Sequence, residues 1–368
     1  MNDDALHRLT DHGVAVWLDH LDRRDLDSGK LERQIAGRRV TGVTTNPTIF
    51  RNALDGNDAY QAQLGELARR GADTDGALLA VTTTDVRRAC DLLMPIHRRT
   101  GGSDGHVSIE VDPRLAHDAA ATVAQAQELR IRVDRPNVLV KIPATTAGLE
   151  ALTRTTALGI SVNMTLLFSL TRYQDVLHAY ARGLRAALAG GLDLGGIASV
   201  ASFFVSRLDT ETDARLAALG GTQAAALRGQ AALANARLAY RIYEQEMARE
   251  HWQRLQAQGA RPQKPLWAST GTKNPAYDDT RYVTGLVAPG TVSTMPQATL
   301  DAVADHAVID RDLRDLYGES AIVLDELAAA GIDYDQVTRE LEEQGLRQFT
   351  DAWLDLRETV RSALEEAH

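Results

Sequence analysis

The sequence is poor in the residues that mark disulfide-rich, zinc-binding and membrane-spanning proteins. Its single cysteine, Cys90, excludes an intrachain disulfide and a cysteine-based zinc site. No apolar run approaches the roughly 18 residues that a membrane span needs. The first residues are polar and acidic, so we expect no secretory signal there. These absences predict a globular protein of the cytoplasm.

The absence of several catalytic and nucleotide-binding motifs excludes further classes of reaction. The ten histidines show neither HxH nor HExxH spacing, which argues against a metal-dependent aldolase or hydrolase. The P-loop motif is absent, and no GxGxxG follows the first predicted strand, which argues against an open nucleotide-binding sheet. We therefore expect chemistry that depends on the side chains of the protein and not on a bound metal.

The net charge of −10 is concentrated at one end of the chain. Residues 307–368 contain 16 acidic and 6 basic residues, whereas the preceding 306 residues contain 34 of each. This distribution argues against nucleic-acid binding, which requires a basic face. A small anionic ligand is compatible with it, provided that one or two local cations hold the ligand.

Short β-branched runs alternate with longer stretches that are rich in Ala, Leu and Arg and have helical periodicity. The eight runs are residues 14–19, 40–46, 107–112, 137–143, 160–167, 197–205, 265–271 and 291–295. Eight such units predict a parallel sheet closed into a (β/α)₈ TIM barrel, with an open doubly wound sheet as the alternative. We predict one domain over residues 1–368, with enlarged helical crossovers at 51–104 and 207–263. About residues 300–368 form an acidic helical C-terminal extension, which packs on the barrel flank or over its mouth.

Polar side chains recur on one face of several predicted strands. The residues are Asp19, Thr44, Asn46, Ser108, Glu110, Asp112, Ser161, Asn163, Thr165 and Ser202. Alternate side chains of a barrel strand point into the interior, and the active site lies at the carboxyl ends of the strands. The pattern therefore predicts a polar pocket at that end. Strand-end capping and turn chemistry are the alternative for each residue taken singly.

Lys141 stands out because the chain has four lysines against 36 arginines. It lies within the apolar run NVLVKIP, where loss of solvent would lower the pKa of its amine. A neutral amine can form a Schiff base with a carbonyl substrate, which a guanidinium cannot do. Asp19 and Glu110 could supply the proton transfers that this chemistry needs. Alternatively, Lys141 reaches solvent or pairs with a carboxylate, and the two acids pair with arginines.

Two segments predict a site for an anion. Arg207 follows the sixth run, and Ser269, Gly271 and Lys273 end the seventh. Barrels frequently bind phosphate in the loops after strands seven and eight, and a hydroxyl-rich turn with a cation suits that role. A turn without a ligand is the alternative.

The order of these motifs resembles the transaldolase family, in particular the longer bacterial type of actinobacteria and cyanobacteria. The resemblance covers roughly residues 10–365. The matching segments are VWLDHL, GVTTNPTIF, VSIEVDPRLAHD, NVLVKIP, GISVNMTLLFSLTRY, SVASFFVSRLDTETD, LRGQAALANARLAY, PLWASTGTKNPAYDDTRYV and TVSTMPQATLDAVADH.

This resemblance implies a class I aldolase-type transferase of the non-oxidative pentose phosphate pathway, without a metal or organic cofactor. Such enzymes move a dihydroxyacetone unit from sedoheptulose 7-phosphate or fructose 6-phosphate to glyceraldehyde 3-phosphate or erythrose 4-phosphate. Lys141 matches the Schiff-base lysine, and Asp19 matches the acid/base of carbon–carbon cleavage. Glu110 matches a carboxylate that acts through a water, and Thr165 the hydroxyl that holds this water.

The remaining matches concern substrate binding. Asn46 and Asn163 match donors to the ketose, Thr44 and Ser202 line the site, and Arg207 and Ser269 match phosphate ligands. Shorter relatives carry an Arg where this chain has Gly271, so Lys273 would supply the second cation here. Ala144 and Gln230 also depart from the family pattern, outside the predicted site.

Two other functions are compatible with the residues. One is an aldolase of the same fold that cleaves fructose 6-phosphate without a sugar-phosphate acceptor. The other is a non-catalytic phosphosugar-binding protein, although Lys141, Asp19 and Glu110 are all present. Both a monomer and a homodimer are compatible with the sequence.

Overall fold

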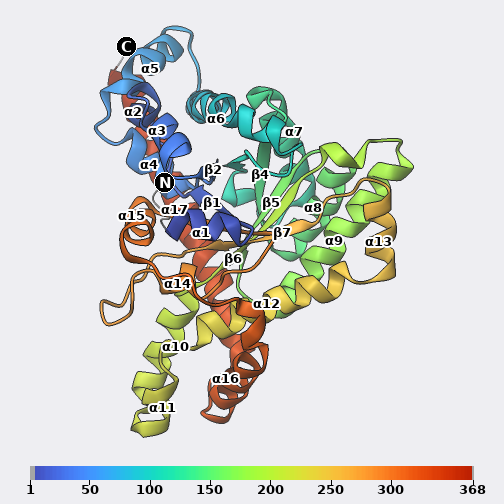
Figure 1. Cartoon of the computed structure of the whole chain (residues 1–368). Coiled ribbons are helices and arrows are strands. Elements are labelled where there is room, and N and C mark those ends of the chain that lie inside the picture. Colours follow the sequence, from blue (N-terminus) through green and yellow to red (C-terminus); the bar gives the residue numbers. More distant parts are fainter. Residues whose placement is uncertain (1–4, 367–368) are drawn as a thin grey trace.

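Eight parallel strands, paired in chain order and closed by β8 against β1, form the centre of the molecule (Figure 1). The computed structural model describes residues 5–366. The strands are β1 (Val14–Leu18), β2 (Val40–Val43), β3 (Val107–Glu110), β4 (Val138–Pro143), β5 (Val162–Leu167), β6 (Ser199–Phe204), β7 (Gln263–Ala268) and β8 (Thr291–Met295). The predicted (β/α)₈ barrel is confirmed, and each predicted run overlaps one strand, although β7 begins two residues before its run.

Helices surround the strands and fill both long connections, as predicted. They are α1 (Ala5–Asp11), α2 (Arg23–Asp27), α3 (Lys30–Gly37), α4 (Pro47–Leu54), α5 (Gln61–Arg69), α6 (Thr74–Arg99), α7 (Ala119–Val133), α8 (Thr146–Ala157), α9 (Leu170–Ala189), α10 (Ser206–Leu219), α11 (Gly221–Leu227), α12 (Ala231–Met247), α13 (Glu250–Ala257), α14 (Arg281–Thr284), α15 (Gln297–His306), α16 (Tyr317–Ala329) and α17 (Tyr334–Glu366). Short 3₁₀ turns are η1 (Asp58–Tyr60), η2 (Pro113–Leu115), η3 (Leu194–Gly196) and η4 (Leu313–Leu316). None of the helices within residues 5–366 has the length and apolarity to cross a membrane.

Several strands end earlier than the predicted runs because polar residues there begin the next turn or helix. The Asn46 side chain caps α4 by accepting from the Ile49 amide at 2.9 Å. The Asp112 side chain caps η2 and pairs with Arg114. The capping alternative is therefore right for Asp112, whereas Asn46 caps a helix and also lines the pocket described below.

The pairing of the strands sets the inner layers of the barrel. Glu110 of β3 lies beside Lys141 of β4, which in turn lies beside Asn163 of β5. Trp17 fills the interior below this layer, because a Cβ atom on Gly42 of β2 would lie 2.3 Å from its indole ring. The absence of a side chain at Gly42 is therefore what admits the indole.

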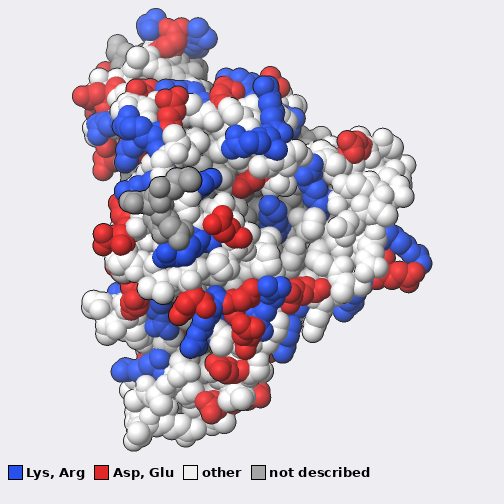
Figure 2. All heavy atoms as spheres, in the orientation of Figure 1, with Lys and Arg blue, Asp and Glu red and all other residues white. Residues whose placement is uncertain are grey.

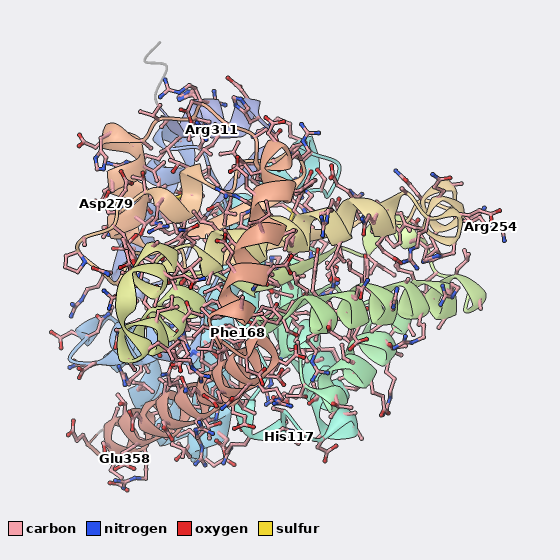
Figure 3. The ribbon with its side chains drawn as sticks, turned by 90° about the horizontal axis from the view of Figure 1, so that it is seen from below. His117, Phe168, Arg254, Asp279, Arg311 and Glu358 are labelled. Carbon is pink, nitrogen blue, oxygen red and sulfur yellow. The ribbon has the colours of Figure 1, made fainter. Side chains whose placement is uncertain are left out.

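The last helix of the C-terminal extension, α17, lies over the carboxyl-end mouth of the barrel, whereas α16 packs on α12 at the flank, so each predicted placement applies to one part of the extension. Helix α17 packs on α4 and η2, which follow the ends of β2 and β3, and also on α5 and on β5. Figure 3 shows it running from beside Phe168, directly after β5, towards Glu358 at the edge of the molecule. Gly345 permits the closest approach, since a Cβ atom there would lie 2.9 Å from Cδ2 of Leu166.

Acidic residues of α17 pair with arginines of the barrel body. Glu340 pairs with Arg215 of α10, and Asp355 pairs with Arg51 of α4. Figure 2 shows acidic and basic side chains interspersed over the face that it draws. The hydrophobic core is continuous between the barrel and α17, as one domain over residues 1–368 would require; that domain boundary stays a prediction.

Candidate active site

A polar cavity of about 170 Å³ opens at the carboxyl ends of the strands. Eight of the eleven predicted site residues line it: Asp19, Thr44, Asn46, Lys141, Ser202, Arg207, Ser269 and Lys273. The other three, Glu110, Asn163 and Thr165, are buried on the strands that carry this layer. Barrel geometry thus brings together residues that are up to 254 positions apart in the sequence.

Lys141 is buried at the floor of this cavity. It is 4% exposed, and its Nζ donates to the backbone carbonyl of Thr45 at 2.8 Å. The same nitrogen lies 3.1 Å from Oε1 of Glu110. The alternative in which the amine reaches solvent is therefore wrong. The amine does pair with a carboxylate, and that carboxylate is itself one of the predicted catalytic groups.

Glu110 is held in an environment that favours its protonated form. Burial raises the pKa of its carboxyl, while the neighbouring Lys141 and the hydroxyl of Thr45 act in the opposite direction. The Thr45 hydroxyl lies 2.9 Å from Oε2 of Glu110 and 2.8 Å from the carbonyl oxygen of Ser108. A carboxyl with a raised pKa can exchange protons nearer to neutral pH than an exposed glutamate can.

Asp19 faces the cavity from the end of β1. Its backbone amide continues the pairing with β8 by donating to the Met295 carbonyl at 2.8 Å. The hydroxyl of Thr44 lies 2.6 Å from Oδ1 of Asp19 and 2.6 Å from the hydroxyl of Thr294. Asp19 is only half-buried, so its second carboxylate oxygen remains available to a ligand in the cavity.

Asn163 is fixed by hydroxyls on both sides. Its Nδ2 donates to Oγ of Ser108 at 3.0 Å, and Oγ of Ser202 donates to its Oδ1 at 2.7 Å. Its amide is therefore aligned within the layer of Lys141. Thr165 is 1% exposed, and its hydroxyl has no hydrogen-bond partner within residues 5–366. Asn46 uses its oxygen for the helix cap, which leaves its amide nitrogen as a donor towards the cavity.

The cations lie at the other end of the cavity. Arg207 stacks over the Phe204 ring at 5.3 Å, and its Nη1 donates to Oε1 of Gln348 at 2.7 Å. Burial lowers the pKa of Arg207, although a guanidinium stays charged at neutral pH. No carboxylate of the described chain lies within ion-pair distance of it. Lys273 is exposed at the rim.

Ser269 has an unusual backbone. Its φ is 56°, in the left-handed region that non-glycine residues rarely adopt. Its hydroxyl lies 2.9 Å from that of Ser206, the first residue of α10, and its carbonyl accepts from the Ser206 amide. Such backbone conformations persist where surrounding contacts enforce them and are common at functional sites. The turn after β7 is therefore fixed against the start of α10.

Sequence reasoning missed several residues of the site. Thr294 lines the cavity from the end of β8, but it shares a strand face with apolar Val292, so the alternation of polar residues did not single it out. Thr45 is the second residue beyond the end of β2, where alternation no longer applies. Gln348 and Phe349 come from α17 and carry no local signal for this role.

Comparisons with known proteins agree with this geometry. A family model described as Transaldolase/Fructose-6-phosphate aldolase matches residues 16–360. The chain belongs to this family. It is 54% identical over 362 residues to "Transaldolase 1" of Streptomyces avermitilis, covering 98% of this chain and 96% of that protein. It is 55% identical over 361 residues to "Transaldolase" of Kocuria rhizophila, with 98% of each chain covered.

The resemblance to the actinobacterial transaldolases is thereby confirmed. A further relative, "Transaldolase" of Acidothermus cellulolyticus, is 53% identical over 365 residues, covering 99% of this chain and 98% of that protein. Within the described residues of this transaldolase-family chain, no group of three or more His, Cys, Asp or Glu side chains is placed to hold a metal ion.

The two buried threonines make a matched pair for testing how Glu110 is held. We expect Thr45→Val to lower the free energy of unfolding by ~1–3 kcal/mol, because Oε2 of Glu110 loses its hydroxyl donor. Thr165→Val removes a hydroxyl that has no partner in the described chain, so it should cost clearly less. Urea unfolding followed by circular dichroism measures both. Equal losses would show that the Thr45 contact contributes nothing specific.

Proposed function

We propose that this chain is a transaldolase in which Lys141 forms the Schiff base. The observation that carries the proposal is the placement of a buried amine 3.1 Å from the Glu110 carboxyl, with Asp19 facing the same cavity. Two carboxyl groups in different environments can serve different proton transfers. The names of the relatives support the transferase assignment.

In this proposal Glu110 assists imine formation. The Lys141 amine attacks the C2 carbonyl of the ketose and gives a carbinolamine. Glu110, directly or through a water held by Thr165, takes the proton from nitrogen and gives one to the departing hydroxyl, so that water leaves and the imine forms. Its raised pKa suits a group that must both donate and accept.

Asp19 acts at the carbon–carbon bond. It accepts the proton of the C4 hydroxyl as the C3–C4 bond breaks, and the bonding electrons pass to the imine nitrogen. The first aldehyde leaves, and a dihydroxyacetone enamine stays on Lys141. Addition of the acceptor aldehyde reverses these steps, with Asp19 returning its proton, and hydrolysis of the imine then frees the lysine.

The polar side chains around the cavity orient the substrate. We assign Asn46, Asn163, Thr44 and Ser202 to the hydroxyls of the ketose, and Arg207, Ser269 and Lys273 to the phosphate. Arg207 suits phosphate because its guanidinium is held by a neutral amide, and within residues 5–366 no carboxylate forms an ion pair with it. The partners are therefore sugar phosphates.

The decisive assay compares turnover with and without an acceptor. Fructose 6-phosphate with erythrose 4-phosphate should release glyceraldehyde 3-phosphate continuously, whereas fructose 6-phosphate alone should stop once each enzyme carries its dihydroxyacetone unit. Equal continuous rates would instead identify the fructose 6-phosphate aldolase, a function that the family description also includes. No turnover in either mixture would identify a binding protein. Lys30→Met, which changes a surface lysine paired with Asp25, is the control that keeps activity.

The contact between Arg207 and Gln348 predicts how strongly the enzyme binds the phosphate of its substrate. Gln348→Glu would place a carboxylate against the guanidinium and should raise KM for fructose 6-phosphate by ~10–150-fold, as loss of one charge-assisted hydrogen bond implies, with kcat little changed. Gln348→Leu keeps the cation free and should raise KM less.

Unphosphorylated fructose at high concentration is the control substrate for these variants. Its turnover should be almost indifferent to Gln348→Glu, since it presents no phosphate to Arg207. If KM rose equally for both substrates, Gln348 would support the position of α17 rather than set the charge at the phosphate site.

A further inference from the structure

A second hollow lies at the opposite end of the barrel from Lys141. Its lining comes from the amino ends of the strands: His106 precedes β3, Ala198 precedes β6, and Lys264 is the second residue of β7. Its volume is about 170 Å³. A neighbouring hollow of about 200 Å³ shares Gly102, His106 and Ala198 with it. The proposed reaction uses none of these residues.

The walls of this hollow are largely apolar and include two aromatic rings. The Trp17 and His106 rings lie 6.2 Å apart at 48°, and Val200, Ala260 and Pro262 complete the lining. Burial lowers the pKa of His106 to about 3, so its imidazole is neutral at physiological pH. Trp17 is fixed by donating from Nε1 to Asp104 at 2.9 Å. These walls suit one flat ring.

Two cations, Lys264 and Arg261, reach the same hollow. Nζ of Lys264 donates to the Ser103 carbonyl at 2.7 Å, and Nε of Arg261 donates to the Gly195 carbonyl at 2.7 Å. Within residues 5–366 neither cation forms an ion pair within 4.0 Å. Asp104 lies behind the lining and interacts electrostatically with Lys264, and its carboxylate accepts from Trp17 and from the Gly105 amide.

The choice of lysine at position 264 is informative in a chain with 36 arginines. Its strand position shares a face with Ala268, which lines the active-site cavity, so Lys264 lies on the inner face of β7. Burial lowers the pKa of its amine. The Lys264 ammonium donates to one backbone carbonyl and therefore retains donors for an anion.

We propose that this hollow at the amino-end mouth of the barrel binds a small organic anion with one flat ring. The ring would lie against Trp17 and His106, and the anionic group would meet Lys264 and Arg261. The size agrees, because an apolar cavity of ~150 Å³ accepts a benzene molecule. The proposal is independent of the reaction assigned to Lys141, since the two cavities share no lining residue.

The Gly-x-Ser-x-Gly spacing beside this hollow, Gly101–Gly105, does not make it a hydrolase site. Such a spacing forms a nucleophile elbow when it joins the end of a strand to a helix. Here it follows helix α6 and leads into β3, and Ser103 is exposed with its carbonyl engaged by Lys264. The hollow is therefore assigned to binding and not to catalysis.

Calorimetry with benzoate tests the proposal on the full chain. Wild-type protein should bind benzoate better than acetate, which lacks the ring, and better than benzyl alcohol, which lacks the charge. Lys264→Met should raise the Kd for benzoate by roughly 10–150-fold, the range for one charge-assisted hydrogen bond. Arg207→Met, at the other end of the barrel, is the matched control and should leave the Kd unchanged.

The results that would contradict a benzoate site differ from those that would contradict the transaldolase proposal. Benzoate binding that is lost with Arg207→Met but kept with Lys264→Met would place the probe in the active site and overturn the inference, as would absence of binding to the wild type. If Lys264→Met does not fold, Ala198→Leu provides a second test. Its larger side chain should fill the hollow and abolish benzoate binding. Unchanged benzoate binding by Ala198→Leu would also overturn the inference. Benzoate should leave KM for fructose 6-phosphate unaltered.

Discussion

A buried amine 3.1 Å from a buried carboxyl is the contact on which the rest of the active site depends. Both groups are less than a tenth exposed, so neither can be stabilised by bulk water. Any charge that one of these groups carries costs several kcal/mol to remove from water, unless close pairing and further hydrogen bonds offset that cost. The Thr45 carbonyl and hydroxyl supply those bonds, one to each partner. The barrel thus keeps a reactive lysine in place and gives it a proton acceptor.

The position of α17 over the mouth of the barrel explains why the C-terminal segment is so acidic. Its carboxylates form ion pairs with arginines of the barrel body, such as Arg51 and Arg215. None of these carboxylates in the described part of α17 pairs with Arg207. Towards Arg207 the same helix presents an amide, Gln348, and a ring, Phe349. A carboxylate there would compete with the phosphate of a substrate. One helix therefore combines a strongly negative composition with a neutral face at the anion site.

Much of the barrel could be predicted because its strands carry period-two alternation of apolar and polar residues, as around Asn163. The same alternation predicted that Glu110 and Asn163 point into the interior, and the strand register places both beside Lys141 in one layer. Thr45 was missed because it lies beyond the end of β2 and contributes through its backbone carbonyl. Gln348 could not be predicted, because an amphipathic helix shows which of its faces is buried but not what that face covers.

The central claim is that Lys141 carries the substrate covalently, and borohydride trapping with peptide mapping tests it most directly. Incubation with fructose 6-phosphate and borohydride should add one reduced dihydroxyacetone unit, located on the peptide that contains Lys141. Lys141→Arg should show no adduct, since a guanidinium cannot form the imine. An adduct on Lys264 or Lys273, or none on the wild-type protein, would contradict the account.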